Sequence, residues 1–118
     1  MAISVQTQNG ITTAFLSGEI DHHGAGDLRR QIDEALGRWM PKQLLLDFRD
    51  VTFMDSSGIG LVMGRYRLIR QWEGQVIICD PAPSIRKVMR LAGLDRIAKI
   101  ENTPPGTVRF AAGKEEEK

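Results

Sequence analysis

The sequence has little of what stabilises small secreted proteins or anchors proteins in membranes. Cys79 is the single cysteine of the 118 residues, so no internal disulfide can form, as is typical of proteins in reducing compartments. No stretch approaches the roughly 18 consecutive apolar residues of a membrane helix, and the N-terminus lacks the basic and apolar regions of a secretion signal. Sixteen basic residues against fifteen acidic ones leave a net charge of +1, which indicates no nucleic-acid or membrane partner. We therefore expect a cytoplasmic protein that binds neither.

Residue sets for metal binding, cofactor binding and covalent catalysis are also scarce. A phosphate-binding loop with Gly-Lys-Ser or Gly-Lys-Thr is absent from the sequence. His22 and His23 are the two histidines, and as neighbours in an extended segment they would point to opposite sides and could not chelate one ion together. No histidine base is expected near Cys79, which disfavours a cysteine nucleophile. We expect no enzyme activity, no metal site and no bound cofactor.

What is present is the composition of an ordinary globular domain. Apolar residues make up 42% of the chain and charged residues 26%, which argues against disorder. The length is sufficient to bury a core without disulfide or metal staples. We expect one domain over residues 1–112, monomeric when free, and a disordered charged tail over residues 113–118.

Apolar periodicity predicts an α/β fold, a mixed β-sheet with about four helices packed on it. Asn9-Gly10 is a strong hairpin turn between two alternating segments, so the sheet begins with an antiparallel hairpin. Strands and helices then alternate, which predicts parallel strands. The expected strands are residues 3–6, 11–16, 43–48, 76–79 and an edge strand at 97–100, with a turn at Arg49-Asp50 and a short segment at 51–54. The expected helices are residues 25–39, 59–72 with a stop at Gly74, 83–92, and a short one at 107–112.

Two of the predicted helices carry basic faces. Solvent-exposed faces are the simpler interpretation, and a surface for an acidic partner is the other. The faces are formed by Arg65, Arg67 and Arg70, and by Arg86, Lys87 and Arg90.

Asp55-Ser56-Ser57-Gly58-Ile59-Gly60 is the most informative segment of the chain. It lies where a buried strand region gives way to an amphipathic helix. The simplest role for Asp55 and Ser56 is to cap the orphan amides of that helix, which is worth about 1 kcal/mol. One cap suffices for one helix, however, and three candidates stand in a row. Because a helix N-terminus also accepts a phosphate, a serine here is a candidate phosphorylation site.

Three glycines, Gly58, Gly60 and Gly64, fall inside this predicted helix, where each costs about 1 kcal/mol relative to alanine. Gly60 and Gly64 are one turn apart and present a strip of backbone to a close neighbour, either another part of the fold or a partner protein. The alternative interpretation is a small nucleotide-binding module, with these glycines as a dinucleotide turn and Asp80 as the ribose ligand. Its weakness is position, because the glycines of that fold form the turn itself, which Asp55-Ser56-Ser57 occupies here.

Three segments together resemble the anti-sigma factor antagonists of the STAS domain family. They are Gly18-Glu19-Ile20-Asp21-His22-His23, Phe53-Met54-Asp55-Ser56-Ser57-Gly58-Ile59-Gly60 and Gly64-Arg65-Tyr66. The resemblance runs from about Ile3 to Ile100 in the same order and spacing, and the first and last segments point to the sporulation (sigma F) member rather than the general-stress member. It implies that residues 1–112 form a STAS domain.

The resemblance also implies a partner-switching mechanism. The unphosphorylated protein would bind an anti-sigma factor that is also a serine kinase and would release the sigma factor held by it. That kinase, using ATP, would phosphorylate Ser56 and end the interaction, and a serine phosphatase would restore it. The implied docking surface consists of Asp21, His22, His23, Asp55, Ser56, Ser57, Gly58, Ile59, Gly60 and Gly64. Apart from the resemblance, the residues leave open whether Ser57 is the acceptor.

Overall fold

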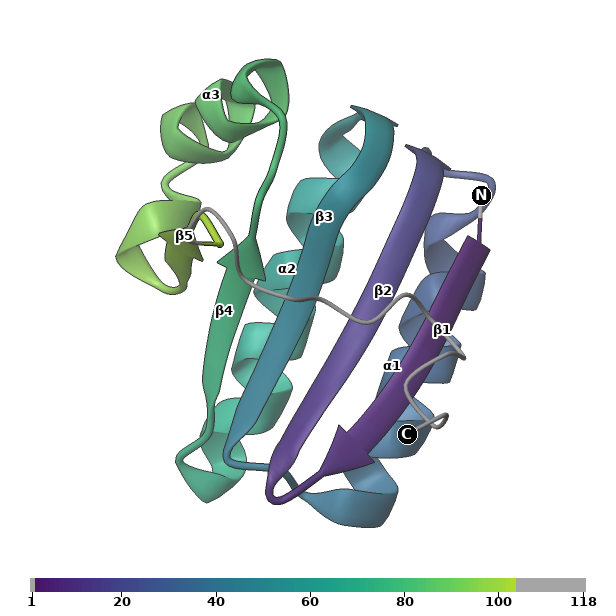
Figure 1. Ribbon diagram of the computed structural model, residues 1–118, viewed down its shortest axis with the longest axis vertical. Helices are drawn as coiled ribbons and strands as arrows, with labels where there is room; N and C mark the ends of the chain where they lie inside the picture. Colours follow the sequence, from purple (N-terminus) through teal and green to yellow (C-terminus); the bar gives the residue numbers. More distant parts are fainter. Residues whose placement is uncertain (1, 104–118) are drawn as a thin grey trace.

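A five-stranded β-sheet with helices packed on it forms the fold. The computed structural model describes residues 2–103, and the strands lie in the order β1-β2-β3-β4-β5 (Figure 1). The strands are β1 (Ala2–Gln8), β2 (Ile11–Ile20), β3 (Gln43–Met54), β4 (Gln75–Cys79) and β5 (Lys99–Glu101). The helices are α1 (Ala25–Trp39), α2 (Ser56–Ile69) and α3 (Pro83–Leu91), with 3-10 turns at Arg70–Trp72 and Leu94–Arg96. β1 and β2 are antiparallel and all later pairs are parallel, so the predicted mixed sheet is confirmed.

The hairpin between β1 and β2 follows from Asn9 and Gly10. Both residues have a positive φ, 55° and 80°, which a two-residue type I′ turn requires and which this residue pair adopts readily. Gln8 consequently pairs with Ile11 across the turn. Because a slip of one residue would turn every side chain to the opposite face, the turn decides which side of β2 enters the core.

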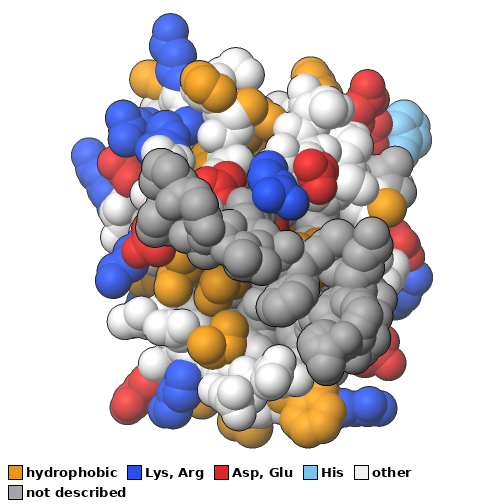
Figure 2. Space-filling model, viewed as in Figure 1, with side chains coloured by type: hydrophobic (Ala, Val, Ile, Leu, Met, Phe, Trp, Pro, Cys, Tyr) orange, Lys and Arg blue, Asp and Glu red, His pale blue; other side chains and the backbone are white. Residues whose placement is uncertain are grey.

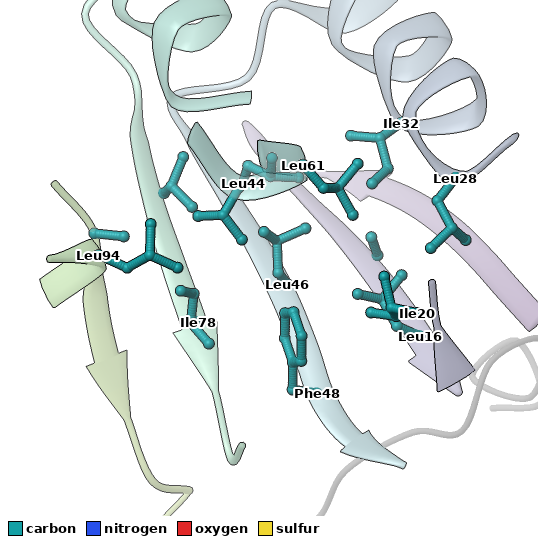
Figure 3. Close-up of a cluster of buried hydrophobic side chains, with 14 of the residues drawn as sticks. Leu16, Ile20, Leu28, Ile32, Leu44, Leu46, Phe48, Leu61, Ile78 and Leu94 are labelled. Atoms are coloured by element: carbon teal, nitrogen blue, oxygen red, sulfur yellow. The ribbon is translucent and has the colours of Figure 1, made fainter. Parts of the chain in front are cut away.

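One face of the sheet carries the core, and α1 and α2 cover it (Figure 3). Leu44 and Leu46 of β3 are fully buried, and Val76 and Ile78 of β4 lie beside them in register. The two helices contribute Leu28, Ile32, Leu36, Leu61 and Val62 to the same layer. Alternation along the strands and the 3.6-residue period of the helices therefore bring the apolar residues together.

β3 is one continuous strand, so the predicted turn at Arg49-Asp50 is wrong. The last pair between β3 and β4 is Asp47 with Cys79, and beyond it β2 alone accompanies β3, through two register irregularities. Val51 and Met54 remain buried in this second half. The polar dipeptide is accommodated as an exposed part of an irregular strand pair, which does not require the chain to reverse.

The described residues contain three α-helices, fewer than the four expected. The short helix expected at 107–112 and the tail at 113–118 lie outside the described residues, so the domain boundary stays a prediction. β5 begins at Lys99 because the Ile97 amide donates to the Leu94 carbonyl at 3.1 Å and closes a 3-10 turn. Over residues 2–103, no helix combines the length and apolar character needed to cross a membrane.

Candidate functional site

The site lies at the far ends of β2 and β3, where these two strands run past the end of β4 (Figure 1). The Asp55 amide, just after β3, donates to the carbonyl of Ile20, the last residue of β2, at 3.1 Å. This bond holds the turn before α2 against the loop that leads into α1. Two segments that are distant in the sequence, residues 21–24 and 55–60, therefore form one surface.

Asp55 is the N-cap of α2, and it leaves Ser56 free of that role. Its backbone is extended (φ −98°, ψ −168°), and its Oδ1 accepts a hydrogen bond from the Ser57 amide at 2.8 Å. The Gly58 amide donates to the Asp55 carbonyl at 3.0 Å. Ser56 is the first residue of the helix and is exposed, so the expectation that it also caps the helix is wrong. A single carboxylate satisfies the cap, as its preference at this position predicts.

Asp21 organises the loop after β2. Its Oδ1 accepts hydrogen bonds from the amides of His23 and Gly24 at 3.1 and 3.2 Å. Its carbonyl accepts from the amides of Gly24 and Ala25 at 3.1 and 2.9 Å, which starts α1. Asp21 is therefore a structural residue of the turn as well as a half-buried part of the surface.

His22 and His23 face each other on this loop. Their ring centroids are 4.1 Å apart with a tilt of 35°, so the prediction that they point to opposite sides is wrong. The two residues lie in a turn, where neighbouring side chains no longer alternate as they do in a strand. His22 Nδ1 lies 4.0 Å from Asp55 Oδ2, which links this loop to the start of α2. Within residues 2–103, no group of three or more His, Cys, Asp or Glu side chains could hold a metal ion.

The three glycines of α2 divide into two kinds. A Cβ added to Gly58 would lie 2.1 Å from Met54 Cγ and 3.5 Å from Ile20 Cγ2, so Gly58 lets α2 pack tightly on the ends of β2 and β3. A Cβ added to Gly60 or Gly64 would meet nothing within 4 Å. A close approach by another part of the fold, one of the two alternatives for Gly60 and Gly64, is therefore wrong for both. It occurs at Gly58 instead, whereas Gly60 and Gly64 leave open space outside α2.

That space is a groove of about 390 Å³ beside α1 and α2. It is lined by Ala25, Arg29, Ser57, Gly60, Leu61, Gly64, Arg65 and Arg67. Of the predicted docking residues it therefore takes in Ser57, Gly60 and Gly64. Ile59 is instead half-buried and packs against the core.

Arg65 was expected on a solvent-exposed basic face, and that prediction is wrong. Its residue exposure is 6%, and its Nε lies 2.8 Å from Asp33 Oδ1 on α1. Burial lowers the pKa of Arg65, the Asp33 carboxylate opposes this, and the neighbouring Arg29 adds to the lowering. The spacing offered a signal, because Arg65 stands four residues from both Leu61 and Ile69 on the buried stripe of the helix.

The geometry gives the dinucleotide-binding interpretation no support. Gly58, Gly60 and Gly64 lie within α2, and Asp55 forms the turn that precedes it. Asp80, the expected ribose ligand, accepts hydrogen bonds from the amide of Thr103 at 2.7 Å and from its hydroxyl. Its carboxylate is engaged in joining the end of β4 to the chain just after β5.

Comparison with known proteins identifies the class to which this fold and site belong. The family model of the STAS domain matches residues 2–105. The chain belongs to the STAS domain family, and the resemblance noted in its sequence is confirmed.

Relatives within this family are similar over most of their length. The chain is 37% identical over 100 residues to an anti-sigma F factor antagonist of Paenibacillus polymyxa, covering 85% of this chain and 86% of the relative. It is 38% identical over 79 residues to an anti-sigma F factor antagonist of Lysinibacillus sphaericus, covering 67% and 68%. Among solved structures it is similar to the anti-sigma factor antagonist SpoIIAA in its unphosphorylated form, with a TM-score of 0.78, 29% identity and coverage of 92% and 100%. The phosphorylated form of the Bacillus SpoIIAA matches with a TM-score of 0.71, 30% identity and coverage of 88% and 93%.

Proposed function

We propose that the protein is an anti-sigma factor antagonist, switched by phosphorylation of Ser56. Unphosphorylated, it binds an anti-sigma factor that is also a serine kinase, and the sigma factor is released. The kinase then transfers the terminal phosphoryl group of ATP to the Ser56 hydroxyl, with ADP as the leaving group, and the complex dissociates. A serine phosphatase hydrolyses the phosphate ester and restores binding.

The observation that carries the proposal is the position of Ser56. It is exposed on the first turn of a 14-residue helix, and Asp55 already caps that helix through the Ser57 amide. Phosphorylation of Ser56 therefore breaks no cap. The positive end of α2 favours a negative charge there, and its first turn contains no acidic residue. The folded domain should therefore tolerate the modification.

The same position makes a phosphate costly for a partner. A phosphoserine carries about −1.5 to −2 charges at neutral pH. It would stand beside the Asp55 carboxylate on the surface formed with the Asp21 loop. A partner that fits the uncharged surface meets new bulk and new charge, so we expect loss of binding without unfolding.

The proposal also covers the sigma-factor pathway and the cellular location of the protein. The relatives that are 37% and 38% identical are antagonists of anti-sigma F factors, whereas a Listeria monocytogenes anti-sigma-B antagonist is 29% identical over 91 residues. This difference supports a sporulation role over a general-stress role. We propose a cytoplasmic regulator that acts as ligand and substrate and performs no catalysis, with ATP bound by the kinase alone.

The test is phosphorylation by the candidate anti-sigma kinase in the presence of ATP, followed by mass spectrometric mapping. The wild type, Ser56→Ala and Ser57→Ala are compared side by side. We expect one phosphate on the wild type and on Ser57→Ala and none on Ser56→Ala. A phosphate retained by Ser56→Ala, or none on any variant with a kinase active on another antagonist, would contradict the proposal.

A further inference from the structure

The groove beside α1 and α2 is electrostatically one-sided. Three of its lining residues are charged, and all three are arginines: Arg29, Arg65 and Arg67. Asp33 pairs with Arg65 but does not line the groove. A space whose charged lining groups are all guanidinium groups attracts an anion.

Arg65, which lines this groove, has two nitrogens without a hydrogen-bond partner. The residue is only 6% exposed, yet neither its Nε nor its Nη1 has a hydrogen-bond partner. Asp33 Oδ1 lies within ion-pair distance of Nε but without the alignment of a hydrogen bond, and it too lacks a partner. A buried guanidinium in this condition costs free energy, which an added acceptor would recover.

The shape of the groove selects a slender ligand. Gly60 and Gly64 add no side chain to its α2 side, and Leu61 between them in the sequence is 4% exposed. A carboxylate on a short aliphatic stem could pass over this strip and reach the guanidinium of Arg65. Arg29 on α1 is exposed and lies at the rim, where it would hold the second oxygen.

We propose that this groove binds the carboxylate of an Asp or Glu side chain of the anti-sigma partner, with Arg65 and Arg29 as its ligands. The inference rests on the proposed function and adds the chemistry of recognition to it. It also explains why modification of Ser56 prevents docking, because Ser57 lines the same groove. A phosphate on the preceding residue places negative charge beside the bound carboxylate, and repulsion between them weakens the complex.

Calorimetric titration of the unphosphorylated protein with the candidate anti-sigma kinase and ADP tests the proposal. Arg29→Gln removes an exposed charge without disturbing the core, and we expect it to weaken binding at least about tenfold. Arg65→Lys keeps the charge but loses the forked donor, and we expect a similar or larger loss. Arg90→Gln is the matched control, since Arg90 is exposed on α3, where basic side chains gather (Figure 2), and does not line the groove. We expect less than about a twofold change.

A partner scan identifies the carboxylate. Each Asp and Glu of the kinase is changed to Asn or Gln, and one such variant should lose as much affinity as Arg29→Gln and no more when the two are combined. Unchanged affinity of Arg29→Gln and of a folded Arg65→Lys would overturn the groove assignment. Equal losses for Arg29→Gln and Arg90→Gln, or no coupled acidic residue, would also overturn it. Mapping of phosphate to Ser56 in the same preparation shows whether the proposed function survives that result. If the wild type neither binds the kinase nor is phosphorylated by it, both the groove assignment and the proposed function are overturned.

Discussion

Two turns of the sheet place an aspartate directly after a parallel strand and use it in different ways. Asp55 follows β3, has an extended backbone and caps its own helix through the Ser57 amide. Asp80 follows β4, has a φ of +56° and binds Thr103. The first turn leaves Ser56 exposed, and the second fastens the end of β4 to the chain after β5 and leaves Pro83 to start α3. The same strand-aspartate-helix order therefore leaves a serine exposed for the proposed recognition in one place and fastens the fold in the other.

The largest expected effect is on the reactivity of the thiol in the Asp80 turn. Cys79 precedes Asp80, and burial, followed by the charges of Asp80 and Glu101, raises its pKa from 9.0 to about 11. At pH 8 the thiolate fraction is about a hundredfold lower than at the ordinary pKa. We expect a thiol reagent to modify the folded protein at least about a hundredfold more slowly than the unfolded protein, in a stopped-flow or mass spectrometric time course. Equal rates would show that this turn opens readily.

The same pKa has a consequence for stability. The folded thiol keeps its proton to higher pH than the unfolded thiol. The contribution of Cys79 to the free energy of unfolding is therefore fully present below pH 9.0 and is lost as pH rises toward about 11. The free energy of unfolding should therefore decrease over that interval. Cys79→Ala should flatten the decrease.

Removal of each aspartate should separate the roles of the two turns. Asp80→Ala loses two hydrogen bonds and places alanine at a positive φ, so we expect a loss of about 2 kcal/mol in urea unfolding. Asp55→Ala loses one cap, and we expect about 1 kcal/mol. Kinase binding should be weakened by Asp55→Ala and not by Asp80→Ala once both are compared as folded proteins. Equal effects of both variants on binding would contradict the division.

Substitution of Gly58 tests how closely the start of α2 packs on the end of β3. Gly58→Ala brings a Cβ within 2.1 Å of Met54 Cγ. Overpacking costs about 1–3 kcal/mol and the better helix propensity of alanine returns about 1 kcal/mol, so we expect a net loss of about 1 kcal/mol by urea unfolding. Adding Met54→Ala should make Gly58→Ala favourable relative to the Met54→Ala background. A stabilising Gly58→Ala in the wild type would show that Met54 moves aside freely.

Elements with a strong local signal were predictable from the sequence. Asn9-Gly10 defined the hairpin because its residues tolerate positive φ, and the apolar stripe of α1 predicted residues 25–39, which form α1. The continuation of β3 through Arg49-Asp50 was not predictable, because it depends on the partner strand β2 extending equally far.

The candidate site was likewise predictable in part from the sequence. Its segments were identified from their residues and spacing, and the structure brings the Asp21 loop and the Asp55 turn together. The pairing of Arg65 with Asp33 joins two helices, so no local pattern specified it. Which glycine is packed and which are open was decided by the position of Met54 relative to α2.

Gly60 and Gly64 provide the smallest expected change in stability and the sharpest test of the proposed docking role of the groove. Because a Cβ at Gly60 or Gly64 meets nothing within 4 Å, either alanine should stabilise the domain by about 0.5–1 kcal/mol in urea unfolding. The same methyl group narrows the groove beside Ser57, so affinity for the kinase in calorimetry should fall. Gain of stability with loss of binding would mean that these glycines are kept for the partner at the expense of the helix. Gain of stability with unchanged binding would confine the docking surface to the Asp21 loop and the first turn of α2.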